Sequence, residues 1–337
     1  MSSIRTLKLF ISLSVLTALA ACAPKSSDQN SFQNGDSQIA NIIGGTDADL
    51  NYAKENGIVG IYDTELGGLC TGSLIADGLV VTAGHCANVA HPEKMIVFFG
   101  PNFDDVIAQA KQSDFSNIRR VTKVIRHEKY GVDAGPVAAV QTAMKATLRS
   151  KKPQGTRQPA SNPPAAPVVA QPIALPISPV MKSTKLSKND ISLVRFNGTA
   201  VAGFKFATLA SATQADLLKV GLHATLAGYG LSEYKQDPNT GETIVGNGAG
   251  VLRQVSEIQV IDLLPSLEEI TFDQSQGHGA CHGDSGGPAY MQDSQTHTSY
   301  LIGVTSRGGG NCDLTAVYTG IIGYSQWIAE NSKQLML

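Results

Sequence analysis

Short runs of hydrophobic residues recur along the chain, and glycine, asparagine or aspartate residues separate them. Runs of four to eight residues bounded in this way are typical of β-strands. One segment near the end has helical spacing instead, with Trp327 and Ile328 placed against Tyr324. The pattern predicts an all-β fold that closes with a short helix over 324–331. The clearest strand-like runs are 57–62, 79–82, 95–99, 224–228 and 300–305.

The first 41 residues differ from the rest in composition. A basic stretch over 1–8 is followed by an apolar run over 9–21. A helix of that length spans about 20 Å, whereas a hydrocarbon core is about 30 Å thick, so residues 1–21 are expected to be a signal peptide. The following residues, 22–41, are mostly polar and are expected to form a tether or propeptide that does not fold.

The apolar run ends in Leu-Ala-Ala-Cys at residues 19–22, which resembles the cleavage box of bacterial lipoproteins. In that class of signal the cysteine is acylated and becomes the first mature residue. The resemblance implies membrane attachment through lipidated Cys22 and export to the periplasm or outer membrane. The alternative is an ordinary secretory signal with a cysteine nearby.

Charge and composition exclude several classes of function. The chain carries 26 basic and 28 acidic residues, a formal charge of −2, so no nucleic-acid partner is expected. Its 42% of hydrophobic residues argues against general disorder. No spacing of histidines and cysteines suggests a zinc site, and neither a dinucleotide fingerprint nor a P-loop is found, so we expect no metal and no cofactor.

Four separated motifs carry residues suited to nucleophilic catalysis. In chain order they are Ile-Ile-Gly-Gly at 42–45, a segment over 70–86 that ends in His85 and Cys86, Asn-Asp-Ile-Ser-Leu-Val at 189–194, and Cys-His-Gly-Asp-Ser-Gly-Gly-Pro at 281–288. Together they resemble the trypsin/chymotrypsin-like serine proteases from residue 42 to about 327. The resemblance implies two packed antiparallel six-stranded β-barrels, a catalytic cleft between them and a short C-terminal helix, so that 42–337 forms the protease domain.

The same resemblance implies a catalytic triad. A serine hydroxyl is a poor nucleophile until a neighbouring base takes its proton. Ser285 would be the nucleophile, His85 the base and Asp190 the carboxylate that orients the imidazole. The backbone N–H groups of Gly283 and Ser285 would form the oxyanion hole. The implied substrates are proteins or peptides.

The Ile-Ile-Gly-Gly segment implies synthesis as an inactive precursor. In the family, cleavage before the first isoleucine frees an amine that is buried against the carboxylate matched here by Asp284. Cleavage between Asn41 and Ile42 would therefore activate the enzyme and, if Cys22 is lipidated, release it from the membrane. Asn41 is not basic, so the activating protease is not expected to be trypsin-like. The alternative is that the segment only begins a strand.

The residues matched to the specificity pocket are small. Gly279 stands where trypsin-like members carry aspartate, so no carboxylate is expected to pair with a substrate Arg or Lys. We expect a medium-to-large apolar residue at P1, the substrate residue before the cut; a small P1 residue is the alternative. Arg307 replaces the usual Trp and is expected to favour acidic substrate residues at neighbouring subsites. The matched pocket residues are Gly279, Ala280, Ser306, Gly308 and Ala316.

An insertion over about 131–186 separates the histidine and aspartate motifs. Between Tyr130 and Asp190 lie 59 residues that hold nine of the fifteen prolines and eight Lys or Arg against one acid. We expect a short helix over 137–148 and extended or disordered chain over 153–179. The segment would be either an exosite or lid, or an insertion tolerated at the surface.

The five cysteines are explained by the two resemblances. The family pattern pairs Cys70 with Cys86 and Cys281 with Cys312, which requires an oxidising compartment. Cys22 is left for the lipid. The rival interpretation of the whole chain is a catalytically idle, protease-like lipoprotein that binds partners.

Overall fold

The computed structural model describes residues 42–131, 188–237, 240, 242–309 and 311–337. Its first half forms a closed antiparallel barrel in the order β2-β3-β4-β7-β6-β5. The barrel holds apolar residues inward, with Ile58, Leu74 and Val80 among those fully buried. Its strands are β2 (Ile58–Asp63), β3 (Gly68–Ala76), β4 (Leu79–Thr82), β5 (Met95–Phe98), β6 (Ile118–Arg126) and β7 (Ser192–Phe196).

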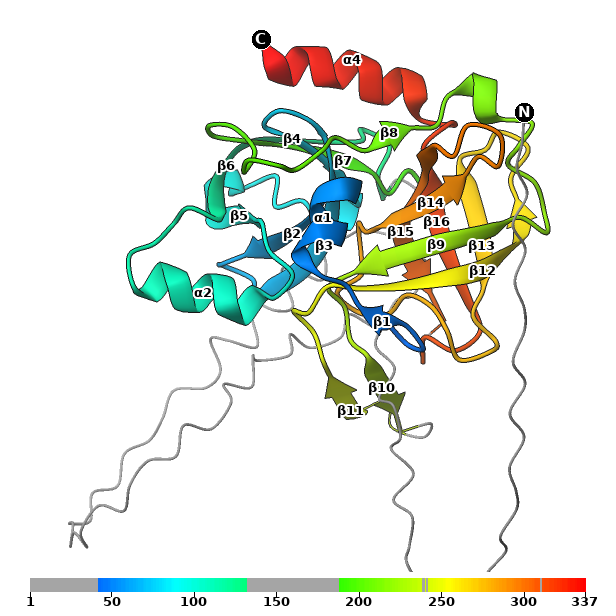
Figure 1. Ribbon diagram of the computed structural model, residues 1–337, viewed down its shortest axis with the longest axis horizontal. Helices are drawn as coiled ribbons and strands as arrows, with labels where there is room; N and C mark the ends of the chain where they lie inside the picture. Colours follow the sequence, from blue (N-terminus) through cyan, green and yellow to red (C-terminus); the bar gives the residue numbers. More distant parts are fainter. Residues whose placement is uncertain (1–41, 132–187, 238–239, 241, 310) are drawn as a thin grey trace, which may run out of the picture. The chain divides into compact units, whose positions relative to one another are not determined.

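The second half forms another six-stranded antiparallel barrel, closed by the pairing of β12 with β9. Figure 1 shows the two barrels side by side. Two short strands, β1 (Thr46–Asp47) and β8 (Thr208–Leu209), add to its edges. The barrel strands are β9 (His223–Gly228), β12 (Arg253–Leu263), β13 (Glu269–Asp273), β16 (Thr315–Gly320), β15 (Ser299–Gly308) and β14 (Pro288–Gln292).

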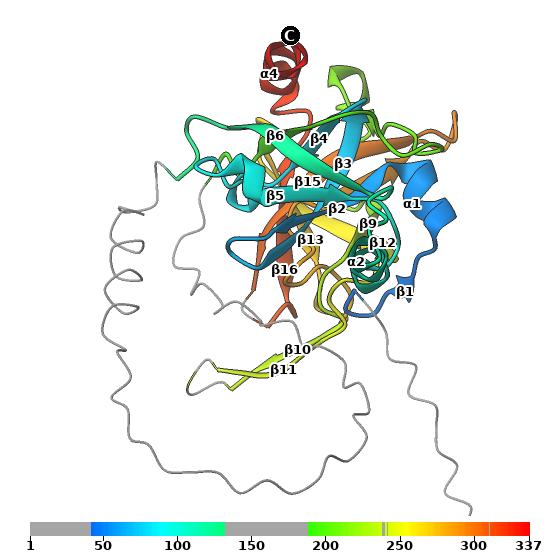
Figure 2. The same cartoon turned by 90° about the vertical axis from the view of Figure 1, so that its left-hand side faces the viewer.

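Polar contacts and packing join the barrels. Tyr229 lies after β9 and Gly100 lies after β5. The Tyr229 hydroxyl donates to the carbonyl oxygen of Gly100 at 2.8 Å. The C-terminal helix α4 (Ser325–Met336) packs against β7 of the first barrel, and Figure 2 shows the helix at the top of the molecule. A hairpin of β10 (Glu233–Gln236) and β11 (Thr243–Asn247) extends away from the barrels (Figure 1).

The expected all-β fold of two six-stranded barrels with a C-terminal helix is confirmed. All five strand-like runs are strands, and α4 continues five residues beyond the expected 331 because Leu335 is also buried. Two helices were not predicted: α1 (Leu50–Asn56) and α2 (Phe103–Lys111). The expected helix over 137–148, the extended segment over 153–179 and the leader lie outside the described residues. Within the described part, no helix is long and apolar enough to cross a membrane.

Candidate active site

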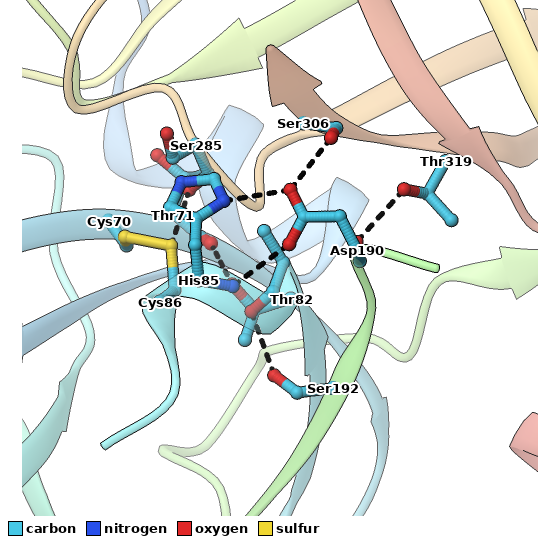
Figure 3. A network of polar contacts seen from close by, with 11 residues as sticks. Cys70, Thr71, Thr82, His85, Cys86, Asp190, Ser192, Ser285, Ser306 and Thr319 are labelled. Carbon is cyan, nitrogen blue, oxygen red and sulfur yellow. Dashed lines mark hydrogen bonds and ion pairs between the residues drawn. A yellow bond between two sulfur atoms is a disulfide. The ribbon is translucent and has the colours of Figure 1, made fainter. Parts of the chain in front are cut away.

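His85 and Asp190 form a direct side-chain pair. His85 lies in a 3₁₀ turn directly after β4, and Asp190 lies two residues before β7, the neighbour of β4. Nδ1 of His85 is 2.8 Å from Oδ2 of Asp190, and the backbone N–H of His85 donates to Oδ1 at 2.9 Å. Both oxygens of the carboxylate therefore hold the histidine in place (Figure 3).

The second barrel supplies further contacts to this pair. The Ser306 hydroxyl of β15 donates to Oδ2 of Asp190 at 2.7 Å. The Thr319 hydroxyl of β16 donates to the backbone carbonyl of Asp190 at 2.9 Å. Tyr324, at the start of α4, donates to Oδ1 of Asn189 at 3.0 Å. Asp190 is thus fixed by both barrels and is only 2% exposed.

The two partners shift each other's pKa. Burial alone lowers the pKa of His85, but the charge of Asp190 and its hydrogen bond outweigh burial, so the pKa is raised. Burial acts to raise the pKa of Asp190, but the charge of His85 and the hydrogen bonds from His85 and Ser306 hold it below its ordinary value. The pair is therefore an ionised carboxylate beside an imidazole of increased basicity.

Ser285 lies in a tight turn before β14. The turn uses positive φ angles of 99° at Gly283 and 80° at Gly286, and a Cβ at residue 286 would lie 2.3 Å from the carbonyl oxygen of Thr71. Thr71 of β3 fixes the turn: its N–H donates to the Ser285 carbonyl at 2.8 Å, and its hydroxyl donates to the Gly283 carbonyl at 3.1 Å. Figure 3 shows the imidazole of His85 between Asp190 and Ser285.

Two backbone donors flank the serine side chain. Among the described residues, we find no hydrogen-bond acceptor for the N–H of Gly283 or for the N–H of Ser285. Both residues are partly exposed. Donors held in a rigid turn without a protein acceptor are suited to bind an oxygen atom of a ligand.

A family model described as Trypsin matches residues 42–175 and 171–328. This chain belongs to the trypsin family. It is 42% identical over 67 residues to the fibrinolytic enzyme, isozyme C, of Lumbricus rubellus, a match that spans 18% of this chain and only 26% of that protein. It is 26% identical over 283 residues to the lectizyme of Glossina austeni, which spans 80% of this chain and 81% of lectizyme.

Both disulfides expected from the trypsin family are present. Cys70 is bonded to Cys86, and Cys281 is bonded to Cys312. These bonds indicate an exported protein, because they persist in oxidising compartments. The two sulfur atoms of the first disulfide lie close to the side chain of His85, and those of the second lie close to the side chain of His282. Sulfur atoms joined in a disulfide are not thiolates, so neither group is suited to hold zinc.

The residues matched to the trypsin-family pocket come together in the second barrel. Gly308 of β15 pairs with Ala316 of β16, and Gly279 and Ala280 precede the Ser285 turn. Ala280 and Ala316 are buried in the hydrophobic core of this barrel. Ser306 lies on the same strand as Gly308, but its hydroxyl binds Asp190. The sequence interpretation assigned Ser306 to the pocket alone and missed this contact.

Arg307 is already paired within the protein. Its Nη2 donates to Oε2 of Glu269 at 2.7 Å, and both side chains are less than a quarter exposed. The expectation that Arg307 favours acidic substrate residues assumed a free positive charge. Glu269 largely neutralises that charge, so the structure does not support the expectation.

Asp284 and Ile42 are both buried beside the pocket segment. The Asp284 carboxylate accepts the N–H groups of Gly230 and Cys281, each at 2.8 Å. Ile42 is fully buried in the core of the second barrel, and the carbonyl of the next residue accepts the N–H of Gly279 at 2.8 Å. The chain directly after the expected cleavage site is therefore packed against the segment that leads to Ser285.

Proposed function

We propose that this chain is a serine endopeptidase that cleaves peptide bonds through an acyl-enzyme. The observation that carries the proposal is the bond between His85 and Asp190, supported by Ser306 from the other barrel. Such a pair serves as a general base only if a nucleophile lies within its reach, and we assign that role to Ser285, which is drawn next to the imidazole in Figure 3. The trypsin-family match is the second support.

The reaction follows from these positions. His85 takes the hydroxyl proton of Ser285 as the serine oxygen attacks the substrate carbonyl, and Asp190 stabilises the imidazolium that forms. The N–H groups of Gly283 and Ser285 bind the negative oxygen of the tetrahedral intermediate. His85 then gives its proton to the leaving amine. Water repeats the sequence on the acyl-enzyme and releases the second product.

The open edge of β15 is suited to bind the substrate backbone. Beyond Thr305, no strand of the described structure pairs with the edge of β15 opposite β16. An extended peptide adds to such an edge through backbone hydrogen bonds. The edge includes Ser306, which contacts Asp190, so a peptide bound there lies beside the catalytic pair.

We further propose that the P1 residue is apolar. Gly279, Ala280, Gly308 and Ala316 carry no charge, and nothing among them would compensate a buried Arg or Lys, for which an unpaired charge costs several kcal/mol. A panel of peptides that differ only at P1 tests the proposal. Apolar P1 residues should be cleaved by the wild type and not by Ser285→Ala, whereas fastest cleavage after Arg or Lys would contradict it.

The family match begins at Ile42, and we propose that the residues before it form a signal peptide over 1–21 and a tether or propeptide over 22–41. We propose that an unidentified protease cuts between Asn41 and Ile42. With lipid on Cys22, this cut converts an anchored precursor in the periplasm or outer membrane into a released enzyme. Active enzyme that still carries acylated Cys22 on the same polypeptide would contradict this proposal.

The insertion over about 131–186 remains either an exosite or a tolerated surface segment. Deleting residues 135–183 and comparing peptide with protein substrates separates the two. An exosite predicts slower cleavage of proteins alone, and a tolerated insertion predicts no change for either substrate.

A further inference from the structure

The resemblance to trypsin-like proteases implied that residue 279 selects the P1 residue. The structure, however, leaves no room for a side chain at Gly279. A Cβ on Gly279 would lie 2.3 Å from Cδ and 2.4 Å from Cγ of Gln274. The φ of Gly279 is also 148°, a value that residues with a side chain rarely adopt. The space next to residue 279 is therefore occupied by Gln274, five residues upstream.

The Gln274 carboxamide is fully buried and bonded on every side. Its Nε2 donates to the carbonyl oxygens of Ala280 and Cys312, both at 3.1 Å. Its Oε1 accepts the N–H of Ala280 at 3.0 Å. Both N–H groups of the amide are thus committed to the backbone, which leaves no donor for a ligand.

These bonds connect two segments that flank the proposed pocket. Ala280 belongs to the segment that leads to Ser285, and Cys312 belongs to the loop between β15 and β16. The backbone N–H of Gln274 also donates to the Leu314 carbonyl in that loop, at 2.9 Å. The Cys281–Cys312 disulfide joins the same two segments. Gln274 therefore fixes the spacing between them as well as the space beside Gly279.

We propose that Gln274, and not residue 279, sets P1 specificity by closing the base of the pocket with an uncharged, fully bonded side chain. The inference rests on the proposed peptidase function and extends it. A pocket closed in this way is shallow, so it favours small and medium apolar P1 residues such as Ala, Val and Leu over Phe and Tyr. Gln274 is a positioning residue, because it touches the pocket backbone and not the reacting atoms.

Peptides that differ only in Val or Phe at P1 test the inference. Shortening Gln274 to Asn or Ala should raise the Phe:Val ratio of kcat/KM, by about tenfold or more for Ala. Gln274→Met keeps the volume but removes the three hydrogen bonds, so it should raise the ratio less than Gln274→Ala does. Gln276→Ala is the matched control, because Gln276 is an exposed residue of the same loop and should not change the ratio.

A double-mutant cycle tests the contact itself. Gly279→Ala should lower kcat/KM strongly in the wild type and much less in Gln274→Ala, because the atoms that its Cβ would meet are then absent. The strain of the positive φ is common to both backgrounds and cancels. Additive effects of the two substitutions would overturn the inference.

The remaining outcomes are also decisive. An unchanged Phe:Val ratio in both shortened variants overturns the inference while wild-type cleavage upholds the proposed function. If Gln274→Ala does not fold, the ratio in Gln274→Asn decides alone. A wild type that cleaves no peptide, although cut before Ile42 and folded, overturns the proposed function and this inference together.

Discussion

The proposed cleavage before Ile42 should change how the stability of the chain depends on pH, because it would free an amine to pair with the buried carboxylate of Asp284. Burial raises the pKa of Asp284 to about 7, although the N–H groups of Cys281 and Gly230 and the charge of Arg253 act against it. While Ile42 is joined to Asn41, its nitrogen is an uncharged amide. Cleavage would create an ammonium group at Ile42, which lowers the pKa of a neighbouring carboxyl group.

The size of the effect follows from the pKa. A rise from 3.8 to about 7 corresponds to about 4 kcal/mol between the two protonation states. Because the folded-state pKa is higher than the unfolded one, this contribution is fully present below about pH 4 and is lost as pH rises through about 7. The uncut chain should therefore lose roughly 2.5–3 kcal/mol of unfolding free energy from this group between pH 5 and pH 8. The cut chain should lose much less.

Urea unfolding of one protein before and after cutting measures this difference. Ser285→Ala prevents self-digestion, and replacing residues 37–41 by Asp-Asp-Asp-Asp-Lys allows enteropeptidase to cut before Ile42. Comparison at pH 5 and pH 8 cancels the titrating groups that both forms share, so the difference reports on Asp284 and on the amine that the cut creates at Ile42. Asp284→Asn is the control and should remove the loss of roughly 2.5–3 kcal/mol that Asp284 gives to the uncut form. Equal pH dependence of the cut and uncut forms would refute the reasoning.

Four further predictions concern the catalytic pair and the second barrel. Asp190→Asn should lower kcat by about 10⁴ at neutral pH. In the wild type, kcat/KM should fall on the acidic side with a pKa above 6.5, because Asp190 raises the pKa of His85. An acidic limb below pH 6.5 would contradict this. Ser306→Ala should lower kcat/KM about tenfold or more, since a hydrogen bond to a charged group contributes about 1.5–3 kcal/mol; unchanged kinetics would count against the role of its 2.7 Å contact. Replacing Cys281 and Cys312 by Ala should lower the unfolding free energy by about 3–4 kcal/mol, and an unchanged urea midpoint would argue against this estimate.

The strands were predictable because they are short, apolar and bounded by turn residues, a signal that is local, whereas the two six-stranded barrels were implied by the resemblance to the trypsin/chymotrypsin-like proteases. It missed α1 and α2, which are brief, although α2 has a readable start: Asn102 accepts the N–H groups of Asp104 and Asp105. A capping residue followed by two acids is a helix-start signal that could have been used.

The site was predictable to the extent that it depends on motifs. The His85–Asp190 contact and both disulfides have the expected partners. The roles of Gln274 and Ser306 were not predictable, because each contact joins residues that are brought together only by the barrel and its loops. Spacing along the chain says nothing about which polar side chain fills a buried gap or completes a carboxylate's hydrogen bonds.

The central claim is that Ser285 is an activated nucleophile. A biotinylated fluorophosphonate tests it directly, because this reagent forms a covalent bond with a serine oxygen that a neighbouring base has activated. We predict that the chain cut before Ile42 is labelled at Ser285, that His85→Ala greatly slows labelling and that Ser285→Ala abolishes it. A cut, folded chain that takes up no label, or is labelled elsewhere, would contradict the account and favour the catalytically idle alternative.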